Sequence, residues 1–513
     1  MPIAAALTLA SVSGGIAVLG WAPLAWWWLT ILAYAALFYL LNQSRTAIQA
    51  GLLGLGYGLA LQLIGHGWVL EALHRKSGMA LAPAALSSLI FAIYLALFSS
   101  LPCVIWRVIM KAAAGSHFSC AVFASLMTQG EWGRSLPFNG FTSLSLGYAL
   151  VDTWLAGYTP IAGVYGMSWL GYYFAASLVL LLTLRRPAPA LILAAILGSG
   201  CALFQVDWVQ ANGQPLSYRL IQANVAQERK FDPLSRGRQM QRLVANIEHE
   251  PADLIVTPET AFTVFLTELL GDILSRLQRF SQDSGSHLFL GIATLTANAE
   301  GHNSVIHLAP GINRIGQYDK VRLMPFGEYG PAGFGWFSSA LAIPLKDLSP
   351  GRSDQQAFQV GGQGIGTLIC HEDLIGEDSR RWLPSATLLI NPSNLAWFEG
   401  SSAIAQRLQI VRLRAMESGR PILRANNTGI TAQIDQRGRV IRQLPKMQEG
   451  TLSGKVQAMQ GLTPSARFGD WPFVLGSLIF LRFCLATKRM RGIPRAIAYA
   501  NVVNLEGKRF AIR

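Results

Sequence analysis

Long apolar runs, each near the length of a membrane-spanning helix, dominate the first part of the chain. Six of them precede residue 207, and a weaker one begins near Phe118. The six cover residues 3–20, 24–41, 50–70, 84–106, 162–183 and 187–206. A last apolar segment, 471–486, follows a long polar region. The pattern predicts an α-helical membrane domain over residues 1–208 with about seven spans, and a C-terminal membrane helix at 471–486 that brings the total to about eight.

Residues 218–455 differ, because short β-branched runs alternate there with amphipathic helical stretches. Strands are expected at 218–225, 253–257, 287–293, 304–308, 314–318, 366–370, 387–391 and 421–425. Helices are expected at 234–249, 265–282 and 401–418, with a hairpin turning at 436–438. Such alternation favours a layered α/β sandwich, and about 240 residues are enough to bury its core. Residues 456–470 would then be a linker to the last membrane helix.

The distribution of charged residues predicts how the chain is oriented in the membrane. Only 14% of the residues are charged, against roughly 25% in a typical soluble domain, and the net charge is +14. The basic excess is clearest in the tail 487–513, which holds Lys488, Arg489, Arg491, Arg495, Lys508, Arg509 and Arg513 against a lone Glu506. Because basic segments stay inside, we expect a cytoplasmic tail, two cytoplasmic termini and an extracytoplasmic polar domain. The tail lacks a recognised nucleic-acid motif, so no nucleic-acid partner is expected.

This orientation depends on the weak span near Phe118, without which the polar domain would face the cytoplasm.

Cysteine placement singles out one thiol. The chain has five cysteines, and Cys370 is the only one in the polar region. It stands at the end of an expected buried strand and is followed by the polar residues His371, Glu372 and Asp373. A thiol there is either a small core residue or a nucleophile that needs a nearby base.

Other chemical groups also follow expected strands. Glu259 comes directly after the strand 253–257, and Lys320 and Glu328 are eight residues apart around a Pro/Gly turn. Taken alone, each is an ordinary loop charge. Together they place a carboxylate, an ammonium and a thiol at strand ends, where α/β proteins build their sites. A carboxylate can move the thiol proton, and an ammonium can stabilise the oxyanion formed on attack at a carbonyl.

The order Glu259, Lys320, Cys370 resembles the nitrilase superfamily, whose Glu-Lys-Cys trio lies on an αββα sandwich. With membrane segments on both sides, residues 1–486 resemble the apolipoprotein N-acyltransferase family within it. The resemblance rests on seven short motifs. They lie at residues 258–259, at Lys320 with residues 325–328, at residues 369–370 with Glu372, at residues 396–398, at residues 414–415 with Glu417, and at residues 426–431 and 461–464.

The resemblance implies Cys370 as nucleophile, Glu259 as general base and Lys320 as the group that stabilises the transition state. It implies that Glu328 and Glu372 are supporting glutamates, with Glu372 positioning Lys320. The implied residues at the substrate are Phe231, His371, Asn394, Trp397 and Phe398. Three positions depart from the family pattern, namely Phe231 in place of Trp, His371 in place of Tyr, and Leu395 in place of Asp.

The implied reaction moves the sn-1 acyl chain of a phospholipid, typically phosphatidylethanolamine, to the α-amino group of the diacylglyceryl-cysteine of an apolipoprotein. It would proceed through a Cys thioester, in the bacterial inner membrane, and in a monomer. Two other readings stay open: a membrane-tethered amidohydrolase of the same superfamily, or a divergent chain whose nitrilase domain has lost activity. No cofactor and no metal are expected, since the polar-domain histidines show no metal-like spacing with cysteines or carboxylates.

Overall fold

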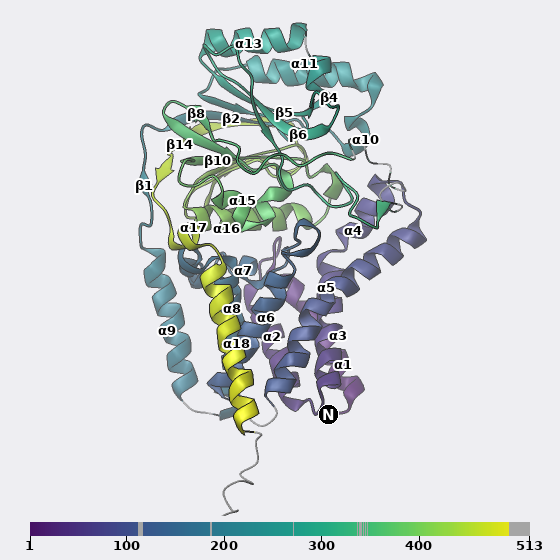
Figure 1. The fold of residues 1–513 in the computed structure, drawn as a ribbon, viewed down its shortest axis with the longest axis vertical. Coiled ribbons are helices and arrows are strands. Elements are labelled where there is room, and N and C mark those ends of the chain that lie inside the picture. Colours follow the sequence, from purple (N-terminus) through teal and green to yellow (C-terminus); the bar gives the residue numbers. More distant parts are fainter. Residues whose placement is uncertain are drawn as a thin grey trace, which may run out of the picture.

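The computed structural model describes residues 1–491 except 111–115, 185–186, 270, 336, 338–340, 342, 344 and 346. A bundle of long helices forms one end of the molecule and a layered α/β domain forms the other (Figure 1). The long helices are α1 (Ile3–Ala17), α2 (Trp27–Gln43), α3 (Ala47–Gly65), α5 (Leu81–Ile109), α6 (His117–Gly133), α8 (Thr159–Leu184), α9 (Pro187–Phe204) and α18 (Trp471–Arg491). The basic tail beyond Arg491 lies outside the described residues.

Each expected membrane segment coincides with one of these helices. The segments Ile3–Gly20, Ala47–Gly65, Leu81–Ile109 and Trp154–Thr183 are long and apolar enough to cross a membrane. Ala188–Phe204 and Trp471–Ala486 are shorter apolar helices. The weak segment near Phe118 is helix α6, which begins with a capping box at Ser116. The helical N-terminal region is therefore confirmed, with four helices that meet the length and composition of a span among the described residues.

Small residues let the membrane helices approach closely. A Cβ on Gly54 of α3 would lie 2.8 Å from the carbonyl oxygen of Ser99 in α5. On Gly14 of α1, a Cβ would lie 2.0 Å from the carbonyl oxygen of Tyr57 in α3. Without a hydrophobic driving force between helices in lipid, such close contact is what holds a bundle together.

The α/β domain contains two main sheets. The seven-stranded sheet has the order β14-β2-β3-β5-β6-β7, with β4 paired to β5, and the six-stranded sheet has the order β13-β12-β11-β10-β9-β8. The strands of the first sheet are β2 (Leu216–Gln222), β3 (Leu254–Val256), β4 (Phe262–Phe265), β5 (His287–Leu295), β6 (Gly301–Leu308), β7 (Gly316–Asp319) and β14 (Gly450–Val456). Those of the second are β8 (Phe358–Val360), β9 (Gln363–Thr367), β10 (Leu388–Ser393), β11 (Ile422–Asn426), β12 (Ala432–Ile434) and β13 (Val440–Gln443). β1 (Gln210–Ala211) and β15 (Met459–Gln460) form a small separate pair.

Alternating side chains of β2 and β3 build a core on each face of the seven-stranded sheet. Leu220 and Val256 pack towards the six-stranded sheet, whereas Ile221 and Ile255 pack against helices α11 (Pro233–Glu248) and α13 (Asp272–Ser284). Helix α16 (Ala403–Ser418) covers the other sheet and also contacts the helical bundle. The layers therefore run α11/α13, sheet, sheet, α16, as in an αββα sandwich, with α16 next to the membrane helices (Figure 1).

One expected helix proved to be wrong. The segment 265–282 contains the last residue of β4, the short helix α12 (Leu266–Leu269) and most of α13, and no single helix spans it. Gly271 lies between the two helices and adopts φ +148, which other residues rarely do. The expected linker 456–470 contains β15 and helix α17 (Pro464–Phe468).

A buried polar cluster joins α16 to the membrane helices. Glu417 accepts a hydrogen bond from the backbone N–H of Val164 in α8 at 2.7 Å and forms an ion pair with Arg414. Arg414 also donates to the hydroxyl of Tyr148 and, at 2.9 Å, to the carbonyl oxygen of Leu374. Arg414 and Glu417, two of the motif residues, thus link the sandwich to the bundle.

Candidate active site

The chemical groups expected at strand ends do follow strands of the sandwich. Glu259 comes after β3, Lys320 directly after β7, and Cys370 after β9. β3 and β7 belong to the seven-stranded sheet and β9 to the six-stranded one. The candidate site therefore draws its groups from both sheets of the sandwich.

Glu259 is a buried carboxylate with hydrogen-bond donors at both oxygens. Oε1 accepts from Lys320 Nζ at 3.0 Å and from Asn303 Nδ2 at 2.8 Å, and Oε2 accepts from the backbone N–H of Asn394 at 2.9 Å. Burial alone would raise the pKa of Glu259, but the ammonium groups of Lys320 and Lys230 outweigh burial and hold the pKa below its ordinary value. Glu259 is therefore ionised at neutral pH and can accept a proton.

The ammonium of Lys320 lies between two carboxylates. Its Nζ is 3.0 Å from Glu259 Oε1 and 2.8 Å from Glu328 Oε2. Asn303 joins the same two carboxylates, since its Nδ2 is 2.6 Å from Glu328 Oε1. Burial would lower the pKa of Lys320, but Glu259 and Glu328 hold it well above its usual range. Lys320 thus supplies a fixed positive charge, and that charge acts on the Cys370 thiol.

Cys370 begins the 3-10 turn η5 (Cys370–Leu374) with a left-handed backbone, φ +47. This conformation is strained for a residue with a Cβ, and such strain is concentrated at functional sites. The side chain is only partly buried. Burial and the charge of Glu259 raise the pKa of the thiol to about 12, against the opposing effect of Lys320. The thiol therefore keeps its proton at neutral pH, and its attack on a carbonyl requires a base such as Glu259.

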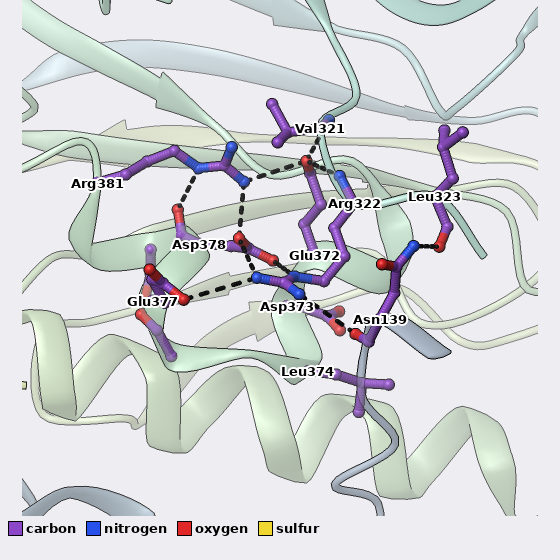
Figure 2. A network of polar contacts seen from close by, with 12 residues as sticks. Asn139, Val321, Arg322, Leu323, Glu372, Asp373, Leu374, Glu377, Asp378 and Arg381 are labelled. Carbon is purple, nitrogen blue, oxygen red and sulfur yellow. Dashed lines mark hydrogen bonds and ion pairs between the residues drawn. The ribbon is translucent and has the colours of Figure 1, made fainter. Parts of the chain in front are cut away.

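Glu372 lies at the centre of a polar network, which Figure 2 shows beside Arg381 and the backbone at Val321. Its Oε1 accepts from the hydroxyl of Tyr318 at 2.8 Å, from the N–H of Val321 at 2.9 Å and from Arg381 Nη2 at 3.2 Å. Its Oε2 accepts from the N–H of Ile369 at 2.7 Å.

These contacts connect Glu372 to the segments that carry Lys320 and Cys370. Val321 directly follows Lys320, and Ile369 directly precedes Cys370. Glu372 therefore supports Lys320 through the backbone, by tying together the two segments that carry Lys320 and Cys370. The direct carboxylate partners of the lysine are Glu259 and Glu328.

We expect Glu372→Gln to lower both stability and activity. An amide can accept at only one of the two oxygen positions and removes one of the two carboxylates that pair with Arg381, and breaking a buried pair costs about 3–5 kcal/mol. Thermal unfolding in detergent and initial rates of acyl transfer measure the two effects. The matched control is Glu377→Gln, because Glu377 is exposed and lies 3.7 Å from Arg322. Equal behaviour of the two variants would contradict this role.

The residues expected at the substrate fall into two groups. Phe231, Trp397 and Phe398 are partly exposed, whereas His371 and Asn394 are buried. Burial lowers the pKa of His371 well below its usual value, so its ring is neutral. The aromatic side chains are thus accessible to a ligand, whereas a buried side chain can support the groups around it.

Asn394 is one such support. Its backbone N–H binds Glu259, its Nδ2 donates to Gln227 Oε1 at 3.1 Å, and its Oδ1 accepts from Asn427 Nδ2 at 3.0 Å. The motif 426–431 therefore acts on the site through Asn394.

A short arm from the membrane domain reaches the loops of the site. It consists of helix α4 (Trp68–Glu71) and the π-helical turn η2 (Ala72–Lys76). The ring of Trp68 lies 4.6 Å from that of Phe398, edge to face. Lys76 forms ion pairs with Glu228 at 2.7 Å and Glu399 at 3.0 Å. The arm thus links the short helix before Phe231 to the turn that carries Trp397 and Phe398.

Sequence reasoning missed two residues of the site, Lys230 and Asn303. Asn303 lies inside strand β6, and nothing in the sequence distinguishes it from an ordinary strand residue. Lys230 directly precedes Phe231, which was singled out, and its burial is visible only in the structure. Among the described residues, no group of His, Cys, Asp and Glu side chains could hold a metal ion.

Two family models match the two parts of this architecture. The carbon-nitrogen hydrolase family model matches residues 219–463, which makes the sandwich a carbon-nitrogen hydrolase domain. The model of the apolipoprotein N-acyltransferase N-terminal domain matches residues 13–177. Among solved structures, the C. elegans NitFhit protein is similar at 15% identity and a TM-score of 0.38, over 56% of this chain and 67% of that chain.

Relatives of nearly the same length are similar throughout. The apolipoprotein N-acyltransferase of Ralstonia nicotianae is 37% identical over 95% of this chain and 94% of its own length. That of Nitrosomonas europaea is 36% identical over 93% and 97%, respectively. The chain therefore belongs to the apolipoprotein N-acyltransferase family, and with its apolar helices it is a bacterial membrane protein.

Proposed function

We propose that this chain moves the sn-1 acyl chain of a phospholipid to the α-amino group of the diacylglyceryl-cysteine of apolipoproteins, the last step of lipoprotein maturation. The observation that carries the proposal is the cluster of Glu259, Lys320 and Cys370 within a member of this family. The cluster offers a base, a fixed positive charge and a nucleophile, which acyl transfer needs.

In the first half-reaction, Cys370 Sγ attacks the ester carbonyl of the phospholipid while Glu259 takes the thiol proton. The S–C bond forms, the ester C–O bond breaks, and Glu259 returns the proton to the departing lysophospholipid oxygen. Lys320 stabilises the negative charge on the carbonyl oxygen during both steps. The product is a thioester on Cys370.

In the second half-reaction, the α-amino nitrogen of the apolipoprotein attacks the thioester carbonyl. The C–N bond forms and the C–S bond breaks, while Glu259 passes the amine proton to the sulfur of Cys370. The enzyme then returns to its starting state, as a ping-pong mechanism requires.

The proposed arrangement in the membrane has eight spans: α1, α2, α3, α5, α6, α8, α9 and α18. The N-terminus and the far end of α18 lie at the end of the bundle away from the sandwich (Figure 1), which supports an even number of crossings. We place both termini in the cytoplasm and the catalytic domain, residues 218–455, on the periplasmic side. The membrane domain is 1–208, and the donor is a phosphatidylethanolamine-type lipid used by a monomer.

The membrane arm supports lateral access of lipid. Trp68 contacts Phe398, and Lys76 binds Glu228 and Glu399, so the bundle touches the aromatic residues proposed to meet the substrate. A lipid could thus stay in the bilayer while its ester reaches Cys370.

The test uses the full chain in vesicles that contain phosphatidylethanolamine, together with a synthetic peptide that begins with diacylglyceryl-cysteine. The proposal predicts a peptide heavier by one acyl chain, and none with Cys370→Ala. Release of free fatty acid without peptide acylation would indicate a hydrolase and contradict the proposal. The same acylation by Cys370→Ala would rule out the nucleophile.

A further inference from the structure

A second buried lysine lies beside Glu259. Lys230 ends the short helix α10 (Gln227–Lys230), and only 3% of its surface is exposed. Its Nζ donates to the carbonyl oxygen of Glu259 at 3.0 Å and to Thr260 Oγ1 at 2.6 Å. A lysine is rarely buried so completely unless its charge is paired, and here the groups in contact are neutral oxygens.

The bonds from Lys230 fix a strained turn. Thr260 adopts φ +45, a left-handed conformation that costs free energy in a β-branched residue. The ammonium binds the carbonyl before this residue and the hydroxyl of the residue itself. The direction in which Glu259 leaves the backbone therefore depends on Lys230.

Helix α10 supports Glu259 from both of its ends. At its start, Gln227 accepts from Asn394 Nδ2 at 3.1 Å, and the backbone N–H of Asn394 binds Glu259 Oε2. At its end, Lys230 holds the Glu259 carbonyl. One four-residue helix thus positions both the backbone and the carboxylate of Glu259.

The charge of Lys230 also acts on the site. The charged and titratable groups around Glu259 and Cys370 are Lys320 and Glu328 from the segment after β7, Asp373 from η5, Arg407 from α16, and Lys230. Burial lowers the pKa of Lys230 to about 8, while the charges of Glu259 and Cys370 oppose that effect. Lys230 is therefore still mainly protonated at neutral pH, and its ammonium favours the ionised form of Glu259.

We propose that Lys230 is a positioning residue for acyl transfer, which holds the turn at Glu259 and Thr260 and keeps Glu259 ionised until Glu259 takes the proton of Cys370. This inference rests on the proposed function of the cluster. It assigns to Lys230 an action through Glu259, since the contacts of its ammonium are with Glu259 and Thr260.

The experiment measures formation of the acyl-enzyme against pH, by intact mass of the full chain in detergent with phosphatidylethanolamine. Lys230→Met removes both charge and hydrogen bonds, Lys230→Gln keeps a donor without charge, and Lys230→Arg keeps the charge. Lys446→Met, at an exposed lysine of the same domain, is the control. Thermal unfolding is recorded for each variant.

We expect the acidic limb of the rate profile to move up by about one pH unit in both neutral variants, because an opposite charge this close lowers a carboxyl pKa by about that much or more. At a pH on this acidic limb, the shift corresponds to a loss of about tenfold in the rate of acyl-enzyme formation by the neutral variants. Lys230→Arg and Lys446→Met should keep the wild-type limb. An unchanged limb in a folded neutral variant, or unfolding of both neutral variants, would overturn the proposal.

Alkylation of Cys370 by iodoacetamide, followed by peptide mass without lipid, repeats the comparison independently of the acyl donor. Removal of the ammonium should shift thiolate formation to higher pH in the neutral variants, and an unshifted curve counts against Lys230. Absence of the acyl adduct in the wild-type chain, with Cys370 still alkylated, would instead count against the proposed function.

Discussion

Replacing Glu259 by glutamine is expected to slow acyl transfer by about 10²–10⁴-fold, the usual contribution of a positioned general base. The amide cannot take the proton that Cys370 holds with a pKa raised to about 12. The NH₂ group of the glutamine must also face a hydrogen-bond donor. In the wild type, Oε1 accepts from Lys320 and Asn303, and Oε2 accepts from the N–H of Asn394. Single-turnover formation of the acyl-enzyme is the measurement.

Glu300→Gln, at an exposed glutamate of the same domain, is the matched control and should keep the wild-type rate. The wild-type enzyme should keep its activity until the pH falls through the depressed pKa of Glu259, because activity needs the ionised form. A Glu259→Gln variant with a rate within threefold of wild type would remove Glu259 from the mechanism.

Replacing Lys320 by methionine is expected to have a comparable or larger effect. The loss of one charge that stabilises an oxyanion costs about 10²–10³-fold. In addition, Glu259 and Glu328 would lie close together without the ammonium that separates them. Their repulsion raises the pKa of Glu259, so the remaining activity should move to higher pH.

The measurement is the pH profile of the same single-turnover rate, with Lys455→Met as a control at an exposed lysine. The pKa of Lys320 is held well above its usual range, so a loss of wild-type activity at alkaline pH should come from another group. If the activity of Lys320→Met fell off at the same pH as that of the wild type, or at a lower pH, the pairing of Lys320 with Glu259 would be contradicted.

Much of the sandwich could be predicted because its strands are buried and rich in β-branched residues. The predicted strand 287–293 is β5 (His287–Leu295), and 253–257 is β3 (Leu254–Val256). The helix expected at 265–282 failed because Gly271, with φ +148, interrupts it between α12 and α13. A glycine inside an amphipathic helical pattern does not by itself reveal such a break.

The site could be predicted only in part. Glu259, Lys320 and Cys370 follow strand ends, where the sequence order already indicates function. Lys230 and Asn303 had no such signal, because a lysine on a four-residue helix and an asparagine within a strand are common at exposed positions. Their role depends on burial and on contacts made across the fold, which the sequence alone does not state.

The structure also explains motif residues distant from the chemistry. Arg414 and Glu417 tie α16 to the backbone of α8 and to Tyr148 of the membrane domain. Thr463 caps helix α17, and Gly461 offers its carbonyl oxygen to Arg420 at 2.8 Å. Arg414 and Glu417 thus hold the sandwich on the bundle, and Gly461 and Thr463 fix the segment that leads to the last membrane helix.

The most direct test of the central claim is the intact mass of the purified chain after exposure to phosphatidylethanolamine, with and without hydroxylamine. Our account predicts a mass gain of one acyl chain that hydroxylamine removes and that Cys370→Ser lacks, since only a thioester on Cys370 has both properties. No adduct on a chain whose Cys370 still reacts with iodoacetamide, or the same adduct on Cys370→Ala, would contradict it.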